Sequence, residues 1–120
     1  MKKYFVLLIA LTLGFFVVAQ KKEIKTAAKE LDKGNYEKAG VALDAAEALL
    51  GSMDEKYKSQ YYLYRSMYYL NNGEPDFSTI KKSIEALKLA TAPAQEQEVK
   101  NQTQNIKVIL VNKASSLLQT

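Results

Sequence analysis

Carboxylates and hydroxyls are the main side chains of this sequence that could do acid–base or nucleophilic chemistry. The 120 residues include no histidine and no cysteine, which removes the commonest general base, the thiolate nucleophile and most transition-metal ligand sets. The acidic pairs Asp54/Glu55 and Glu30/Asp32 fall at expected helix ends, where carboxylates serve as caps or as solvated charges. No glycine-rich phosphate loop is present. We therefore predict no catalytic residue, no metal or cofactor site, and no enzymatic activity.

Tyrosine is the other side chain with functional potential, and it is concentrated in one place. Six of the eight tyrosines lie between Tyr57 and Tyr69. At about 100° per residue they cover more than one face of a helix, which is then apolar almost all round. Such a helix normally has neighbours on most sides, so we predict that residues 56–72 form the central helix and that most rings are core. An exposed tyrosine row that stacks on sugar rings is the alternative.

The N-terminus has the layout of a secretory signal peptide. Lys2 and Lys3 precede an apolar run over residues 5–18, and small or medium-sized residues follow up to Ala19. The run is shorter than the roughly 20 residues of a transmembrane span. We predict a signal peptide over residues 1–19, secretion across the inner membrane into the periplasm, and membrane contact only before cleavage. An uncleaved membrane anchor is the alternative, whereas the lack of cysteine excludes an acylated lipoprotein terminus.

The charge balance of the chain indicates no nucleic-acid partner. There are 17 basic and 13 acidic residues, and loss of Lys2 and Lys3 with the signal peptide leaves 15 basic residues and a net charge of +2. Lysine and glutamate are interspersed rather than clustered on one basic face. We therefore expect a protein or peptide partner and no nucleic acid.

Helical periodicity and punctuation predict five helices and no strand in residues 20–120, which form one domain. The expected helices cover about 21–33, 36–50, 53–72, 77–90 and 94–119. Gly34 should end the first helix and Asn35 should cap the second, while Ser52 to Glu55 read as a capping box for the third. Two inward faces are expected in the last two helices: Phe77, Ile80, Ile84 and Leu87, and then Val99, Ile106, Leu110, Ala114 and Leu117.

Residues 34–39, which read GNYEKA, resemble the turn signature of the tetratricopeptide repeat (TPR), a helix–turn–helix unit of about 34 residues. In that family the glycine makes the tight turn, the tyrosine packs there and the alanine lets the paired helices touch. A second, looser unit has Gly73 at its turn and Phe77 in the place of the tyrosine. The resemblance implies an all-α, TPR-like α-solenoid of antiparallel helix pairs, with units at about 21–51 and 53–90 and a final helix at about 94–119. A five-helix bundle is the alternative.

The TPR resemblance also implies where a partner would bind. In the family, the first helix of each unit lines the concave surface that grips peptides or partner helices. Carried onto this sequence, the partner-binding residues would be Gln60, Leu63, Met67, Leu70 and Asn71.

The apolar end of the last helix bears on assembly. Repeat proteins need roughly three units and a polar cap at each end, but residues 106–118 are strongly apolar. Either the chain is the N-terminal part of a longer repeat protein, which we favour, or the last helix is a cap or a self-association surface.

The sequence as a whole thus predicts a non-enzymatic protein-interaction scaffold of the bacterial cell envelope, which binds a peptide or partner helix in a helical groove. A glycan-binding module that uses exposed tyrosines is the alternative, and an enzyme accessory subunit is a third possibility.

Overall fold

The computed structural model describes residues 18–71 and 74–119, and every regular element among them is helical. A first helix covers residues 18–32, and two 3₁₀ turns, Leu50–Ser52 and Pro93–Gln95, precede the third and fifth helices. The remaining helices are α2 (Tyr36–Glu47), α3 (Glu55–Asn71), α4 (Phe77–Lys88) and α5 (Glu96–Leu118). The predicted all-α fold with five helices is thus confirmed for the described residues. The expected signal peptide lies almost entirely outside them, as do Asn72 and Gly73.

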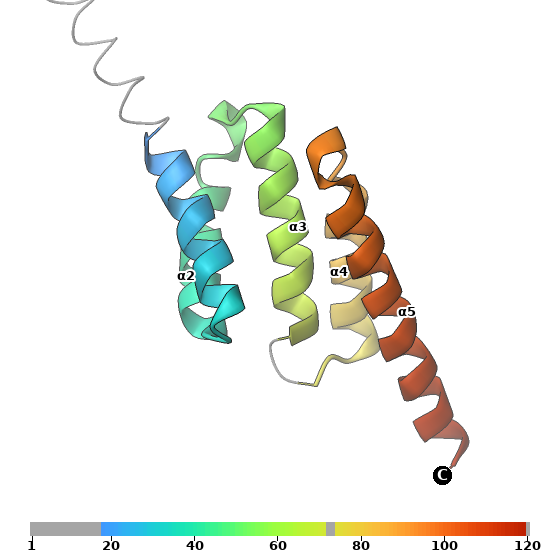
Figure 1. Ribbon diagram of the computed structural model, residues 1–120. Coiled ribbons are helices and arrows are strands. Elements are labelled where there is room, and N and C mark those ends of the chain that lie inside the picture. Colours follow the sequence, from blue (N-terminus) through green and yellow to red (C-terminus); the bar gives the residue numbers. More distant parts are fainter. Residues whose placement is uncertain (1–17, 72–73, 120) are drawn as a thin grey trace, which may run out of the picture.

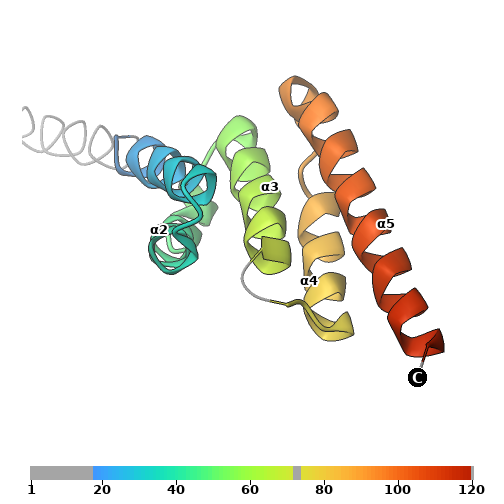
Figure 2. The same ribbon diagram turned by 60° about the horizontal axis from the view of Figure 1, so that its bottom comes forward.

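The helices form two layers around α3. Successive helices run in alternating directions (Figure 1). The first helix, α3 and α5 lie side by side in one layer, and α2 and α4 lie behind them (Figures 1 and 2). Because α3 contacts α2, α4 and α5, the prediction that the tyrosine-rich segment is the central helix is confirmed.

The core consists of two apolar clusters that meet at α3. The first joins the first helix, α2 and the start of α3, and it includes Leu43. The second joins the end of α3 to α4 and α5, and it includes Leu63. Tyr62 and Tyr64 pack against both clusters. Their rings therefore make one continuous apolar interior out of two helix-pair interfaces.

The turn after the first helix confirms the expected role of Gly34. Its φ of 77° lies in the left-handed region that glycine enters without steric cost. The Gly34 amide donates to the Leu31 carbonyl at 3.1 Å and the Asn35 amide to the Glu30 carbonyl at 2.8 Å, which is the Schellman pattern. Asn35 does not cap α2 with its side chain as predicted, because its amide group donates to the Glu30 carboxylate at 2.8 Å. The Asn35 side chain thus links the turn back to the first helix.

Two aspartates start the helices that follow. The Asp54 carboxylate accepts from the Tyr57 amide at 2.9 Å, and Asp76 accepts from the Thr79 amide at 2.8 Å. The predicted capping box is therefore wrong in its cap residue, since the Ser52 hydroxyl donates backwards to the Leu49 carbonyl at 3.0 Å. As a result α3 begins at Glu55 rather than Met53, and the buried Met53 packs in the first cluster.

The second half of α5 carries much of its apolar surface into solvent. This half extends past the end of α4 (Figure 1), and Val111 and Leu118 are 63 % and 88 % exposed. Ala114 and Leu117, which were predicted to face inward, are also exposed. The end of α5 extends beyond the helices packed against it (Figure 1), so its last turns are covered only in part.

Phe77 was predicted to face inward as well. Its side chain is instead 51 % exposed, and the Lys113 ammonium lies 5.4 Å from the centre of its ring.

Among the described residues, no helix has both the length and the apolar content that crossing a membrane requires.

Candidate functional site

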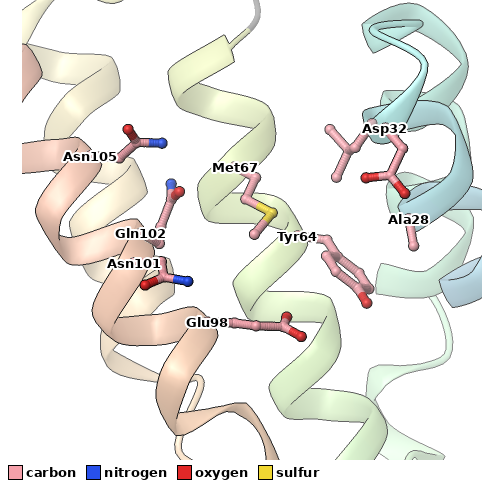
Figure 3. A pocket seen from close by; sticks show the side chains of 9 residues that line it. Ala28, Asp32, Tyr64, Met67, Glu98, Asn101, Gln102 and Asn105 are labelled. Atoms are coloured by element: carbon pink, nitrogen blue, oxygen red, sulfur yellow. The ribbon is translucent and has the colours of Figure 1, made fainter.

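A cavity of about 500 Å³ opens between the first helix, α3 and α5 (Figure 3). The first helix forms one wall, α5 forms the opposite wall, and Tyr64 and Met67 of α3 form the floor. Its lining residues are Ala28, Leu31, Asp32, Tyr64, Met67, Glu98, Asn101, Gln102 and Asn105. Polar groups therefore surround an apolar and aromatic floor.

The wall formed by α5 is fixed to α3 and α4 by a buried chain of hydrogen bonds. The Gln102 amide nitrogen donates to the Ser66 hydroxyl at 3.3 Å, and the Ser66 and Ser83 hydroxyls are 2.8 Å apart. The Ser83 hydroxyl also donates to the Ser66 carbonyl at 2.8 Å. All three side chains are buried, and serine is small enough to let the three helices approach closely. These hydrogen bonds hold α5 at a fixed distance from α3 and so fix the position of one wall of the cavity.

The start of α5 is held by a second set of polar contacts. The buried Ser59 hydroxyl of α3 donates to the Gln95 side-chain carbonyl and accepts from the Ala92 amide at 3.0 Å. The turn Pro93–Gln95 is thereby tied to the beginning of α3. Glu98 lies in the first turn of α5, so its position follows from this attachment.

Tyr64 experiences the negative charges of both walls. Burial raises the pKa of Tyr64, and the nearby carboxylates of Glu98 and Asp32 raise it further. The phenol is therefore a neutral hydroxyl across the physiological pH range. No ion pair is found for Asp32 or Glu98 among the described residues. The cavity thus has two unpaired carboxylates and a strong acceptor character.

A smaller cavity of about 200 Å³ continues the first along the same helix pair. The two cavities share Ala28 and Tyr64 and therefore lie next to each other along the first helix and α3; we call the pair the groove. The smaller cavity is lined by Lys21, Ile24, Lys25, Ala28, Lys56, Tyr57, Gln60 and Tyr64. The groove is therefore acidic at the α5 end and basic at the other.

Arg65 points away from this groove and joins α3 to α2. Its guanidinium donates to Asp44 at 2.6 Å, to Glu47 at 3.2 Å and to the Tyr61 hydroxyl at 3.1 Å. Burial lowers the pKa of Arg65, but the hydrogen bonds to Asp44 and Tyr61 outweigh burial and the net pKa is raised. This permanently charged group lies between three tyrosine rings and serves the packing of the two helices.

The predicted partner-binding residues are divided between the groove and the core. Met67 lines the larger cavity and Gln60 the smaller one. Leu63 and Leu70 are 0 % and 3 % exposed and pack in the second core cluster, where a partner cannot reach them. Asn71 is exposed, and its amide group donates to the Met67 carbonyl at 2.9 Å.

Sequence reasoning missed most of the polar lining. Asp32 was interpreted as a solvated charge at a helix end, and no role was assigned to Glu98 or Gln102. Their common position becomes evident only once the first, third and fifth helices share a layer. The available signal was polar residues at Glu98, Asn101, Gln102 and Asn105, spaced by three and four on one helix face.

Nothing in the described part of the chain groups three or more histidine, cysteine or acidic residues in a geometry suited to a metal ion.

No family model matches this chain, and comparisons with curated proteins and with solved structures find no match either. The resemblance to tetratricopeptide repeats therefore stays a prediction that is carried by residues 34–39. The groove itself is the main guide to function.

Proposed function

We propose that this protein is a non-enzymatic protein-interaction scaffold of the bacterial cell envelope. It binds an extended peptide segment or a partner helix in the groove between the first helix, α3 and α5. The observation that carries this proposal is the pair of adjoining cavities that form the groove, whose walls come from three helices and whose lining combines an aromatic floor with polar sides.

The size and construction of the groove support this function. Ligand sites in proteins typically have volumes of about 300–1,000 Å³, and the larger cavity alone has about 500 Å³. Its rim offers amides and carboxylates, which can pair with the backbone and side chains of a polypeptide. The buried chain through Ser66, Ser83 and Gln102 keeps the site preformed, which lowers the entropic cost of binding.

A TPR-like solenoid accounts for the position of the groove. In such a solenoid the first helix of each pair lines the binding surface, which here would be the first helix, α3 and α5. Three features at the predicted turn signature support this architecture: the left-handed Gly34, the half-buried Tyr36 and the fully buried Ala39. The units would be about 21–51 and 53–90, followed by a final helix at about 94–119.

The location of the protein in the cell envelope rests on the N-terminal sequence. The basic start and apolar run of residues 1–19 support secretion across the inner membrane. A periplasmic scaffold of this kind needs no cofactor, because its function is shape and charge complementarity.

No observation favours the glycan-binding alternative. Every tyrosine of the described part is buried or half-buried, so no exposed aromatic row is available for sugar rings. The tyrosines instead serve the two core clusters, and Tyr64 contributes one face to the groove floor.

Selection from a displayed library of random peptides tests the proposal. Peptides selected on the purified chain should lose binding to the Ala28→Trp variant, because the indole fills the point that the two cavities share. Binding would be measured by fluorescence anisotropy of labelled peptides.

Ala45→Trp is the matched control. Ala45 is an exposed position of α2 that lines neither cavity, so the same substitution there should leave binding unchanged. Thermal unfolding followed by circular dichroism verifies that both variants fold. Selected peptides that bind Ala28→Trp as tightly as the parent chain would contradict the proposed function.

A further inference from the structure

The chemistry of the larger cavity is one-sided. Asp32 on one wall and Glu98 on the other are exposed carboxylates without an ion pair among the described residues. None of the described residues that line this cavity is a lysine or an arginine. Figure 3 shows the two carboxylates reaching in from opposite walls with the Tyr64 ring between them. A group that enters this space therefore meets negative charge from both sides.

The buried Gln102 adds an acceptor that is oriented independently of these charges. The Ser83 hydroxyl donates to the Ser66 carbonyl, so the hydrogen between the two hydroxyls belongs to Ser66. The Ser66 hydroxyl can then only accept from Gln102, which requires the amide nitrogen of Gln102 to face inward. The side-chain carbonyl of Gln102, on a residue that is 3 % exposed, has no partner among the described residues and lines the cavity. This carbonyl oxygen is accessible to solvent in the cavity, since no buried side-chain oxygen of the described residues lacks a hydrogen-bond partner, and a donor from a ligand can therefore reach it.

The environment of Tyr64 also favours a cationic group in the larger cavity. Its phenol is kept protonated by burial and by the carboxylates of Glu98 and Asp32, which raise its pKa. A cation in the cavity would balance both carboxylates, and it would also lie close to the face of an aromatic ring.

The other end of the groove has the opposite charge. Lys21, Lys25 and Lys56 line the smaller cavity, and none of them has an ion pair among the described residues. Its lining in the described part of the chain includes no acidic residue. The two ends are joined through Ala28 and Tyr64, so one extended segment can occupy both.

We propose that the groove selects a polypeptide segment that carries a basic side chain at the Asp32–Glu98 end and an acidic side chain at the Lys21–Lys25–Lys56 end. The basic group lies between the two carboxylates and donates to the Gln102 carbonyl. Arginine suits this cavity best, because its planar guanidinium presents five donors and several acceptors converge here. The inference rests on the proposed function, since it specifies which segment the groove binds.

A crossed set of peptides and variants tests the inference. The probes are labelled extended peptides of alanine and serine with one arginine and one glutamate at variable separation. In matched probes, citrulline, an uncharged isostere, replaces arginine, or glutamine replaces glutamate. We expect citrulline to weaken binding about tenfold through loss of charge-assisted hydrogen bonds. Glutamine should weaken it about threefold, because the lysines are solvent-exposed.

The variants assign each charge to its end of the groove. In Asp32→Asn/Glu98→Gln, arginine and citrulline peptides should bind alike while the glutamate preference persists. In Lys25→Gln/Lys56→Gln, glutamate and glutamine peptides should bind alike while the preference for arginine over citrulline persists. The control Glu74→Gln/Glu85→Gln removes the same charge at exposed positions outside the groove and should change neither preference.

Two results would overturn the inference. Equal binding of arginine and citrulline peptides to the parent chain is one, and an arginine preference that survives Asp32→Asn/Glu98→Gln is the other. In either case, the proposed function stands if the Ala28→Trp substitution abolishes peptide binding. If the peptides bind the Ala28→Trp variant as tightly as the parent chain, both the inference and the proposed function are overturned. Saturation of Gln102 and Asn105 side-chain amide shifts by Ca²⁺ alone, without effect from the arginine peptide, would assign the cavity to a metal ion and overturn the inference too.

Discussion

At the scale of single residues, small polar side chains inside the core set the geometry of this protein. Ser66 and Ser83 are both fully buried, where leucine or alanine would be usual, and Gln102 is buried beside them. Each hydrogen bond in this chain contributes modestly, but a buried polar group left without a partner is costly. The three residues therefore specify one spacing of α3, α4 and α5 rather than simply filling space.

Ser83→Ala is expected to lower the free energy of unfolding by about 1–2 kcal/mol, because the buried Ser66 hydroxyl loses its acceptor. Chemical denaturation with an unchanged m-value measures this. The double variant Ser66→Ala/Ser83→Ala should cost less than the two single changes together, since both partners are then removed. Additive costs would show that the two hydroxyls do not interact.

Tyr64 predicts a loss of stability in alkali. Burial and the charges of Glu98 and Asp32 raise its pKa in the folded state above the ordinary value of 10.0. The folded protein then holds the phenol proton more tightly than the unfolded chain. The resulting stabilisation is complete below pH 10.0 and is lost as pH rises through the folded-state pKa.

The variant Tyr64→Phe isolates this contribution. It should unfold with a shallower pH dependence than the parent chain above pH 10.0, as followed by circular dichroism in denaturant. Tyr61, whose pKa is also raised by burial, remains in both proteins and serves as the internal reference. Identical slopes for the two chains would refute the assigned cause.

At the scale of elements, the turns determine where each helix begins and ends, and thereby which side of each helix packs against its neighbours. The Schellman turn at Gly34 reverses the chain after the first helix, and the aspartate caps start α3 and α4. The tyrosines of α3 then face neighbours on several sides. The groove follows from these reversals, because they return every second helix to the same layer.

Gly34→Ala should destabilise the fold by about 1 kcal/mol, since a Cβ at this positive φ is strained even though no atom lies within 4 Å of it. Gly51→Ala is the matched control, because Gly51 also has open space around it but no left-handed φ. That variant should be neutral or slightly stabilising. Thermal unfolding of the pair measures the difference, and equal effects would contradict the backbone argument.

Sequence periodicity predicted the helices well, but it predicted less completely which of their residues are buried. Gly34 and the aromatic pattern of α3 are local signals, so the reversal and the central helix could be deduced. The predicted inward faces of α4 and α5 are confirmed at Ile80, Ile84, Leu87, Val99, Ile106 and Leu110, which lie in or pack against the second core cluster. Phe77 and Leu117 are exposed instead, because whether they are covered depends on how far neighbouring helices extend. The same limit explains why Leu63 was placed at a partner surface although it lies in the core.

At the scale of the whole molecule, the two ends of the helical array differ. The first helix and α2 close one end around the first core cluster, with Ala27 and Ala46 fully buried. At the other end the last turns of α5 extend beyond α4, and Val111 and Leu118 face solvent. Self-association through this surface, or coverage by a following segment of a longer chain, stays a prediction.

Hydrogen exchange should reveal this asymmetry along α5. Amides of residues 99–106 are expected to be protected, since Val99 and Ile106 pack in the second core cluster. Amides of residues 111–118 should exchange much faster, because few buried contacts hold those turns. Mass spectrometry of peptides from the two halves measures the contrast. Uniform protection at high protein concentration that falls on dilution would instead indicate a second copy bound along the exposed half.

Because Ser66, Ser83 and Gln102 are joined by buried hydrogen bonds, the position of the α5 wall depends partly on residues other than those that line the cavity. Only Gln102 of the three lines the cavity, whereas the two serines act from behind it. A bulkier residue at Ser83 would push α4 away from α3 and displace α5, which would move one wall of the cavity while every lining side chain stayed the same. Under the proposed function, the range of partners can therefore change along two separate routes, one through charges at the rim and one through side-chain size at Ser66 and Ser83, which do not line the larger cavity.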